Sequence, residues 1–145
     1  MAQPQSKMVR LLIVADPRSP ELASLTLPPS VTLVGTGRTA EDFAGLSDAD
    51  LASVNVLFLC GITTFAGNRE HVMALWPRLT GLMWLHSSFA GVDRLLFPEL
   101  VAAKHVLLTN AKGVYSNSLG EWALAACNYF AKAIPRLRAA QKAGK

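Results

Sequence analysis

Residues 54–60 read V-N-V-L-F-L-C, a run that is apolar at almost every position. A strand with one wet face alternates apolar and polar residues, whereas a strand covered on both faces is apolar throughout. Four further runs of this kind recur along the chain, at Val9–Ala15, Val31–Gly35, Leu82–Ser87 and His105–Asn110. Together the five runs predict a parallel sheet with helices on both faces.

The segments between these runs carry helical spacing or turn residues. Residues 68–79 place apolar side chains at helical intervals, and residues 91–104 do the same in two pieces separated at Pro98. Residues 39–52 predict one short helix with a break at Gly45, and residues 17–30, with four prolines, predict a loop or a single turn. The alternation of strands and helices predicts an α/β fold, a three-layer, doubly wound open sheet with strand order 2-1-3-4-5.

The last predicted element is a long C-terminal helix that is apolar around much of its circumference. Residues 118–121, S-L-G-E, match a capping box and predict the helix start, and Pro135 follows the last apolar position. A helix apolar on so many sides needs cover on more than one of them. We therefore expect residues 117–145 to pair with a second copy of the chain or with further polypeptide. The apolar positions are Leu119, Trp122, Ala123, Ala126, Cys127, Tyr129, Phe130 and Ile134.

Composition excludes several classes of protein. With 51% hydrophobic and 17% charged residues, the chain is too apolar to be intrinsically disordered, although residues 1–8 are expected to be. Its longest apolar runs are far shorter than the roughly 18 residues of a membrane span, so no membrane partner is expected. The N-terminus lacks a secretory pattern, and Cys60 and Cys127 are interpreted as buried thiols. These features favour a cytoplasmic protein without a metal site.

The formal net charge of +4 is concentrated at one end of the chain. From Trp122 onward there are five basic residues and no acidic one, which leaves nine basic against ten acidic residues, a net charge of −1, in the rest. Basic residues near the end of a helix also interact favourably with its dipole. We therefore expect no nucleic-acid partner.

Two motifs suggest chemistry that their context does not support. Residues 35–40, G-T-G-R-T-A, match the dinucleotide pattern G-x-G-x-x-A, but Gly45 interrupts the helix that should follow. Residues 60–61, C-G, also stand where that pattern needs an acidic residue and where a phosphoacceptor domain needs its carboxylate. A flexible loop is therefore favoured over a phosphate site. His86 and Ser87 are adjacent on a predicted strand and point to opposite faces, which argues against a base–nucleophile pair.

The segment W-L-H-S-S-F-A-G-V-D at residues 84–93 is the strongest candidate site. It leaves the fourth strand through a turn of small residues and is expected to enter a helix, with Asp93 in its first turn. Backbone N–H groups at such a place bind a carboxylate or a phosphate. Ala90 and Gly91 let a ligand approach the backbone closely. An ordinary strand-to-helix turn explains the same residues equally well.

This segment and a second one, L-L-T-N-A-K-G-V-Y-S-N-S-L-G-E-W-A-L at residues 107–124, resemble motifs of the D-isomer-specific 2-hydroxyacid dehydrogenase family. The two motifs come in the order and separation of that family's N-terminal, flavodoxin-like substrate-binding domain. The resemblance implies that Ala90, Gly91 and Val92 bind the substrate carboxylate through main-chain amides. It also implies that Tyr115 contacts substrate and that Ser116 lies beside the cofactor, while a simple turn before a helix explains both residues as well.

The resemblance further implies an oxidoreductase of two domains. In that family, residues 9–116 correspond to the substrate-binding domain, and the helix at 117–145 crosses to a Rossmann domain that binds NAD or NADP. Hydride passes between the nicotinamide and C2 of a 2-hydroxy or 2-oxo acid, and the catalytic residues lie in that second domain. We therefore expect a truncated chain, inactive alone, that binds no cofactor and has no catalytic residue. Two alternatives remain, namely a non-enzymatic dimerisation or regulatory module and a stand-alone carboxylate-binding domain.

Overall fold

The structure is a computed structural model that describes residues 8–61 and 69–144. The chain divides into two compact units, Met1–Ala111 and Lys112–Lys145, and each is described by itself. Most of the N-terminal segment for which disorder is predicted, residues 1–7, lies outside the described residues.

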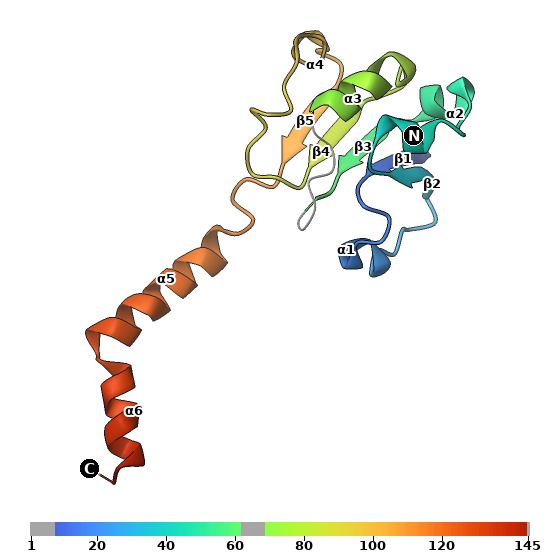
Figure 1. The fold of residues 1–145 in the computed structure, drawn as a ribbon. Coiled ribbons are helices and arrows are strands. Elements are labelled where there is room, and N and C mark those ends of the chain that lie inside the picture. The colour runs from blue at the N-terminus through green and yellow to red at the C-terminus, as the bar shows by residue number, and fades with distance from the viewer. Residues whose placement is uncertain (1–7, 62–68, 145) are drawn as a thin grey trace, which may run out of the picture. The chain divides into compact units, whose positions relative to one another are not determined.

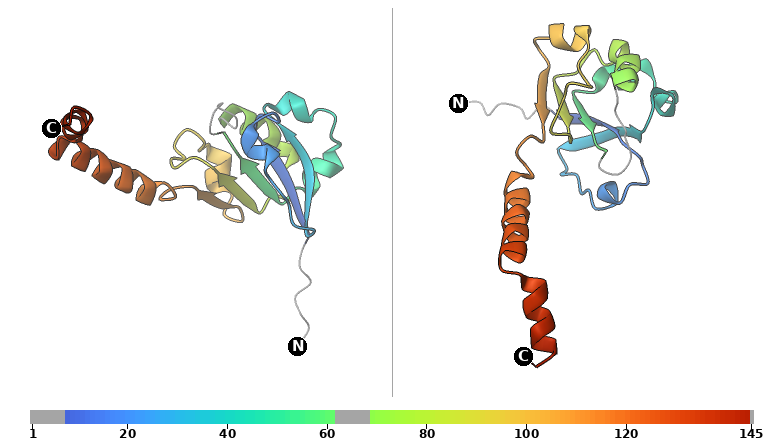
Figure 2. Two further views of the ribbon diagram at one scale, coloured as in Figure 1. Left: turned by 90° about the horizontal axis from the view of Figure 1, so that it is seen from below. Right: turned by 60° about the vertical axis from the view of Figure 1, so that its left-hand side comes forward.

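The first unit contains a five-stranded parallel sheet with strand order β2-β1-β3-β4-β5. This order confirms the prediction, and all five apolar runs form strands, most of them shorter than the runs themselves. The sheet and the helices on its two faces are shown in Figure 1 and Figure 2. The strands are β1 (Val9–Val14), β2 (Val31–Gly37), β3 (Val56–Leu59), β4 (Trp84–Ser87) and β5 (Leu107–Asn110).

The strands are apolar on both faces because each face packs against its own core. Leu12, Val14 and Leu57 belong to the larger core, while Leu11 and Ile13 belong to a smaller one on the opposite face. Successive residues of a strand point to opposite faces, so a run without polar residues contributes to both cores. The apolar pattern therefore predicted the three-layer arrangement correctly.

Short helices cover the larger core, and their buried side chains include Phe43, Leu51 and Leu75. The segment 39–52, for which a helix with a break at Gly45 is predicted, forms two elements on either side of that glycine, and Ser47 caps the second by accepting a hydrogen bond from the N–H of Asp50. On the opposite face, the single turn α1 (Pro20–Ala23) contributes Leu22. The elements over the larger core are η1 (Ala40–Phe43), α2 (Asp48–Ser53), α3 (Arg69–Leu75), η2 (Trp76–Arg78) and α4 (Pro98–Ala102).

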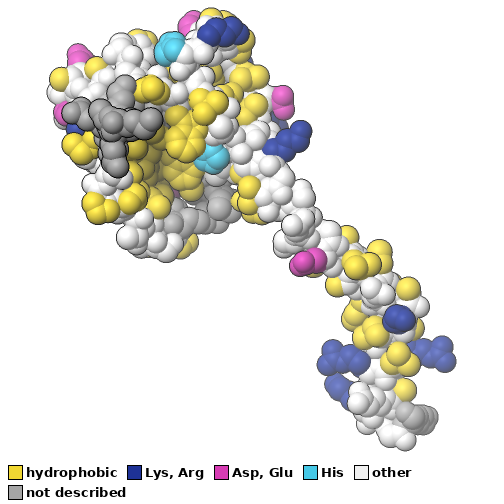
Figure 3. All heavy atoms as spheres, turned by 180° about the vertical axis from the view of Figure 1, so that it is seen from behind, with side chains coloured by type: hydrophobic (Ala, Val, Ile, Leu, Met, Phe, Trp, Pro, Cys, Tyr) yellow, Lys and Arg dark blue, Asp and Glu magenta, His cyan; other side chains and the backbone are white. Residues whose placement is uncertain are grey.

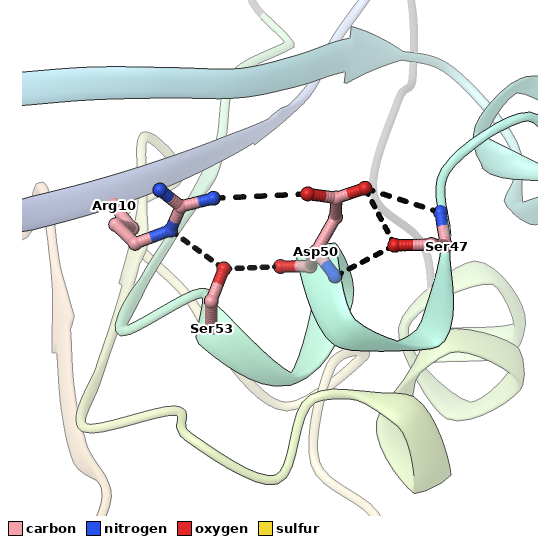
Figure 4. A network of polar contacts seen from close by, with 4 residues as sticks. All are labelled: Arg10, Ser47, Asp50 and Ser53. Atoms are coloured by element: carbon pink, nitrogen blue, oxygen red, sulfur yellow. Dashed lines mark hydrogen bonds and ion pairs between the residues drawn. The ribbon is translucent and has the colours of Figure 1, made fainter.

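A polar network joins β1 to α2 at the edge of the larger core (Figure 4). The Nε–H of Arg10 donates to Ser53 Oγ at 2.6 Å, and a guanidinium nitrogen lies 3.9 Å from Asp50 Oδ1. Ser47 donates from its hydroxyl to the other Asp50 oxygen at 2.6 Å. These hydrogen bonds from Ser47, together with the charge of Arg10, lower the pKa of Asp50 below its ordinary value.

The smaller core covers only part of its face, and the side chains of β3, β4 and β5 extend beyond it. Trp84 and Leu107 are 41% and 60% exposed in neighbouring strands. Next to them, the indole N–H of Trp84 donates to Thr109 Oγ1 at 2.8 Å, and the same oxygen shares a 2.7 Å hydrogen bond with His86 Nδ1. The polar groups of this open face are therefore tied to one another and not to a covering element.

The second unit consists of two helices, α5 (Ser116–Ala131) and α6 (Ile134–Lys142), and not of one continuous helix. Between them Ala133 adopts a left-handed conformation, with φ of 48°, and Pro135 follows at the start of α6. Proline has no N–H to donate, so α5 does not continue through this position. Hydrophobic side chains lie exposed along this unit, and basic ones gather towards its C-terminal end (Figure 3).

Two predictions for the second unit are wrong. The helix begins at Ser116 after Tyr115, without a side-chain cap, so residues 118–121 lie inside the helix and form no capping box. Cys127 is exposed, whereas Cys60 is buried at the end of β3, as predicted. The capping box is absent because the helix has already begun at Ser116, and Cys127 is exposed because α5 buries no residue.

Candidate functional site

The candidate carboxylate-binding loop, residues 88–92, begins where β4 ends at Ser87 and lies at the carboxyl edge of the sheet. Within the described residues, the backbone N–H groups of Ala90, Gly91 and Val92 donate no hydrogen bond. Almost all buried backbone N–H groups of folded proteins have a hydrogen-bond partner, so three consecutive N–H groups without one are unusual. Ala90 and Gly91 are exposed and Val92 is half-buried, so solvent or a ligand reaches this stretch.

The carbonyl side of the same loop is held by residues at the end of β5. Asn110 Nδ2 donates to the carbonyl oxygen of Ala90 at 2.8 Å, and the N–H of Ala111 donates to the carbonyl of Phe89 at 3.2 Å. The carbonyls of Phe89 and Ala90 are thereby occupied, whereas the N–H groups of Ala90, Gly91 and Val92 stay available, so donors predominate among the unpaired groups of the loop. This polarity suits an anion and not a cation.

Two serines complete the anchoring of the loop. Ser88 Oγ accepts from the N–H of Gly61 at 3.3 Å, and the N–H of Ser88 donates to Leu59 O at 2.9 Å, which ties the loop to the end of β3. Ser87 is buried, and its Oγ accepts from the N–H of Phe89 at 3.3 Å. His86 contacts Thr109 on the open face, so His86 and Ser87 do not pair, as predicted.

The loop does not lead directly into a helix, which corrects the prediction for Asp93 and for the first of the two pieces expected within residues 91–104. After Val92 the chain makes a single turn, in which the N–H groups of Leu95 and Leu96 both donate to the carbonyl of Val92. The next helix, α4, starts only at Pro98. Proline restricts the residue before it to extended conformations, which prevents a continuous helix here. The free amides therefore act as individual dipoles and gain nothing from a helix macrodipole.

Gly91 leaves the approach to these amides open. A Cβ built at Gly91 would have one neighbour within 4 Å among the described residues, an Asp93 side-chain oxygen at 3.7 Å, which is ordinary contact. Gly91 also has no positive φ. The fold itself therefore tolerates a side chain at this position, and what the glycine leaves free is space on the solvent side.

One cation beside the loop was missed by the sequence analysis. Arg69, the first residue of α3, donates from Nη2 to the carbonyl oxygen of Asp93 at 3.2 Å. Its guanidinium therefore stands next to the turn that follows the free amides. The contact joins residues 24 positions apart, and no local pattern predicts such a contact.

The other two predicted site residues belong to the second unit. Tyr115 immediately precedes α5, and Ser116 is its first residue; both are exposed. The structure thus brings Ala90, Gly91 and Val92 together on one loop of the first unit and places Tyr115 and Ser116 together at the start of α5.

The residues described do not fit a dinucleotide cofactor at the one motif that suggested it. In the loop 35–40, the N–H groups of Arg38 and Thr39 both donate to Asp42 Oδ2, at 2.6 and 3.0 Å. The hydrogen bonds from Thr39 and then Arg38 hold the pKa of Asp42 below its ordinary value. The amides that would bind a pyrophosphate are already bonded to a carboxylate of the chain itself.

Across residues 8–61 and 69–144, no three His, Cys, Asp or Glu side chains are grouped so that they could hold a metal ion. None of the helices in these ranges has the length and apolar character needed to cross a bilayer. No protein-family model matches the chain, and no curated protein matches it.

Proposed function

We propose that this chain is the substrate-binding part of an NAD(P)-dependent oxidoreductase acting on 2-hydroxy or 2-oxo acids. Its role in that reaction is to bind the substrate carboxylate through the amides of Ala90, Gly91 and Val92. The observation that carries the proposal is the set of three N–H groups without a partner in the described residues, on a loop whose Phe89 and Ala90 carbonyls are bonded at the end of β5. The resemblance of residues 84–93 and 107–124 to the D-isomer-specific 2-hydroxyacid dehydrogenases supports the class of substrate.

The proposal assigns hydride transfer to a separate nucleotide-binding domain. In the loop at 35–40, the N–H groups of Arg38 and Thr39 donate to Asp42 and are therefore not available to a pyrophosphate. We assign no catalytic residue to this chain, whose part in the reaction is to bind and orient the carboxylate. Purified alone, it is expected to oxidise no 2-hydroxy acid with NAD or NADP above a control without protein.

The binding step is tested by NMR on the ¹⁵N-labelled chain titrated with glycerate, lactate, glyoxylate and acetate. Saturable shifts of the Ala90, Gly91 and Val92 amides are expected, because hydrogen bonds to an anion change the amide environment directly. The 2-hydroxy and 2-oxo acids should bind more tightly than acetate. Absence of shifts at these three amides at millimolar glycerate would refute the carboxylate site.

A matched pair of glycine variants separates ligand approach from folding. Gly91→Val adds a side chain in front of the amides, while the fold has room for its Cβ. Gly45→Val adds the same side chain where the Cβ meets nothing within 4 Å. The first variant should lose the carboxylate shifts and the second should keep them, with both spectra otherwise well dispersed. Equal binding by the two variants would contradict the role of this loop.

A second candidate function is a dimerisation module, and the apolar surface of α5 favours it. Trp122 and Phe130 are 72% and 76% exposed. With 3.6 residues per turn, they lie near one side of the helix together with Leu119 and Ala126, whereas Leu124 lies on the opposite side. A contiguous exposed apolar stripe of this kind marks an interaction surface.

Light scattering tests this second candidate. A dimer of the 15.6 kDa chain is expected, converted to monomer by Trp122→Ser or Phe130→Ser and preserved in the control Leu124→Ser. A monomeric wild-type chain, or an undefined mass that grows with concentration, would contradict a specific dimer.

A further inference from the structure

A second polar site lies at the carboxyl ends of β1 and β2, separate from the loop after β4. Its walls enclose a hollow of about 430 Å³ that is lined by Asp16, Pro17, Arg18, Thr36, Arg38 and Asp42. The hollow lies on the β2 side of β1, whereas the topological switch point lies between β1 and β3. Both places lie outside the carboxyl ends of the strands, where open α/β sheets bind their ligands.

The two carboxylates of the hollow are already supplied with donors. Asp16 Oδ1 accepts from the N–H of Arg18 at 2.9 Å, and Asp42 Oδ2 accepts from the N–H groups of Arg38 and Thr39. One oxygen of each carboxylate is therefore held by the backbone, and the other oxygen of Asp16 faces Arg38 in an ion pair.

The cationic side chains of the hollow are not satisfied in the same way. Arg38 makes one loose ion pair, 3.9 Å from Nη1 to Asp16 Oδ2. Arg18 is exposed, and neither its guanidinium nor the Thr36 hydroxyl forms a hydrogen bond or an ion pair with the part of the chain that the structure describes. Each guanidinium carries five N–H donors, so both arginines keep most of their donors available for a ligand.

We infer that this hollow binds the phosphate group of a small molecule, with Arg18 and Arg38 as its charged partners and Thr36 as a neutral donor. Guanidinium groups hold phosphate oxygens in bidentate pairs, and both arginines of the hollow have free N–H donors for such pairs. The hollow has the size of a small-molecule site and exceeds the space of one phosphate, which favours an ester over the free ion. This inference does not rest on the function proposed for the loop at 88–92.

The test is a titration of the ¹⁵N-labelled full chain with glycerol 3-phosphate, inorganic phosphate, malonate and chloride at matched ionic strength. Saturable shifts of the Arg18, Thr36 and Arg38 amides are expected with the two phosphates, and tighter binding of the ester identifies the ester as the ligand type. Malonate is a dicarboxylate of the same charge; binding of malonate as tight as that of the ester would overturn the phosphate assignment. Identical responses to chloride would overturn the site altogether.

Three charge-matched variants locate the binding. Arg18→Gln and Arg38→Gln should each weaken glycerol 3-phosphate binding by about tenfold or more, as expected for loss of a charged hydrogen bond. The control Arg94→Gln removes the same charge from an exposed arginine after β4 and should leave binding unchanged. Affinity within twofold of wild type in either of the first two variants, or an equal loss in the control, would overturn the inference. The Ala90–Val92 amides in the same spectra report separately on the carboxylate loop.

Discussion

Gly81 lies where the chain turns between η2 and β4, and replacing it with alanine should force two segments of backbone apart. A Cβ at this position would stand 2.3 Å from the carbonyl oxygen of Ala52 in α2 and 3.3 Å from that of Val54. Real Cβ atoms essentially never approach closer than 3.0 Å, so the turn and the end of α2 must separate by about 0.7 Å. Both obstacles are backbone atoms and not flexible side chains. Gly81 has no positive φ, so close approach alone requires glycine here.

The destabilisation caused by this separation is partly offset by a stabilising effect of the same substitution on the unfolded chain. Overpacking of a well-packed region destabilises by about 1–3 kcal/mol, and loss of glycine's freedom in the unfolded chain returns about 0.4–1 kcal/mol. Gly81→Ala should therefore lower the free energy of unfolding by about 1–2 kcal/mol. With a urea m-value of about 2 kcal/mol per molar, the midpoint falls by about 0.5–1 M.

Urea unfolding followed by tryptophan fluorescence measures this change in the first unit. A Trp122→Phe background leaves Trp76 and Trp84 as the reporters, and Trp76 packs edge-to-face on Phe97 at 5.2 Å. The control is Gly45→Ala, whose Cβ meets nothing within 4 Å and which should raise stability by about 0.4–1 kcal/mol. The two substitutions should shift the midpoint in opposite directions. A Gly81→Ala midpoint equal to or above that of wild type would refute the close-approach argument.

Three further predictions test the core, the loop and the polar network. Leu57→Ala, at a fully buried position in β3, should cost about 2–5 kcal/mol, whereas Leu33→Ala, at a side chain 45% exposed, should change stability by less than about 0.5 kcal/mol; equal urea midpoints would contradict the core assignment. Asn110→Ala, which removes the hydrogen bond to the loop carbonyl, should speed amide exchange at 89–92 and weaken carboxylate binding about two- to tenfold, while Asn128→Ala in α5 leaves both unchanged. The folded-state pKa of Asp50 is lowered from 3.8, so in acid the folded chain binds fewer protons than the unfolded one. The stability that ionised Asp50 contributes is therefore complete above about pH 3.8 and is lost as the pH falls through the folded-state pKa. The urea midpoint between about pH 5 and pH 2 should therefore fall more steeply in wild type than in Asp50→Asn, and parallel curves would refute the assignment.

The sheet could be predicted from the sequence because its signal is local and repeated. Each of the five runs is apolar at consecutive positions, and burial on both faces leaves no other explanation for such a run in a chain of this composition. The residue at which the second helix within 39–52 starts was harder to predict. It depends on whether Ser47 caps a helix, and many serines at equivalent spacing cap none. Residues 118–121 show the converse, because they match a capping box inside a helix that had already begun at Ser116.

The candidate site was predicted in outline and not in its supports. Ala90 and Gly91 indicated exposed amides, and those amides donate to no described residue. Asn110 from β5 binds the loop from 20 positions away in the chain, and Arg69 from α3 binds the turn after it from 24 positions away. Contacts of this kind depend on tertiary packing, which the local sequence does not encode. The separation at Pro98 was predicted correctly, since α4 begins there, but the first of the two expected pieces, after Gly91, is a single turn and not a helix.

The two cysteines, Cys60 and Cys127, differ in exposure and should therefore react with a thiol reagent at different rates. Cys60 is 7% exposed at the end of β3, a central strand, while Cys127 is exposed on α5. A thiol reagent should therefore label the folded chain at one position at once, and at the second only when the middle of the sheet opens. The mass of the labelled product, with one adduct or two, therefore reports opening of the sheet without any introduced cysteine.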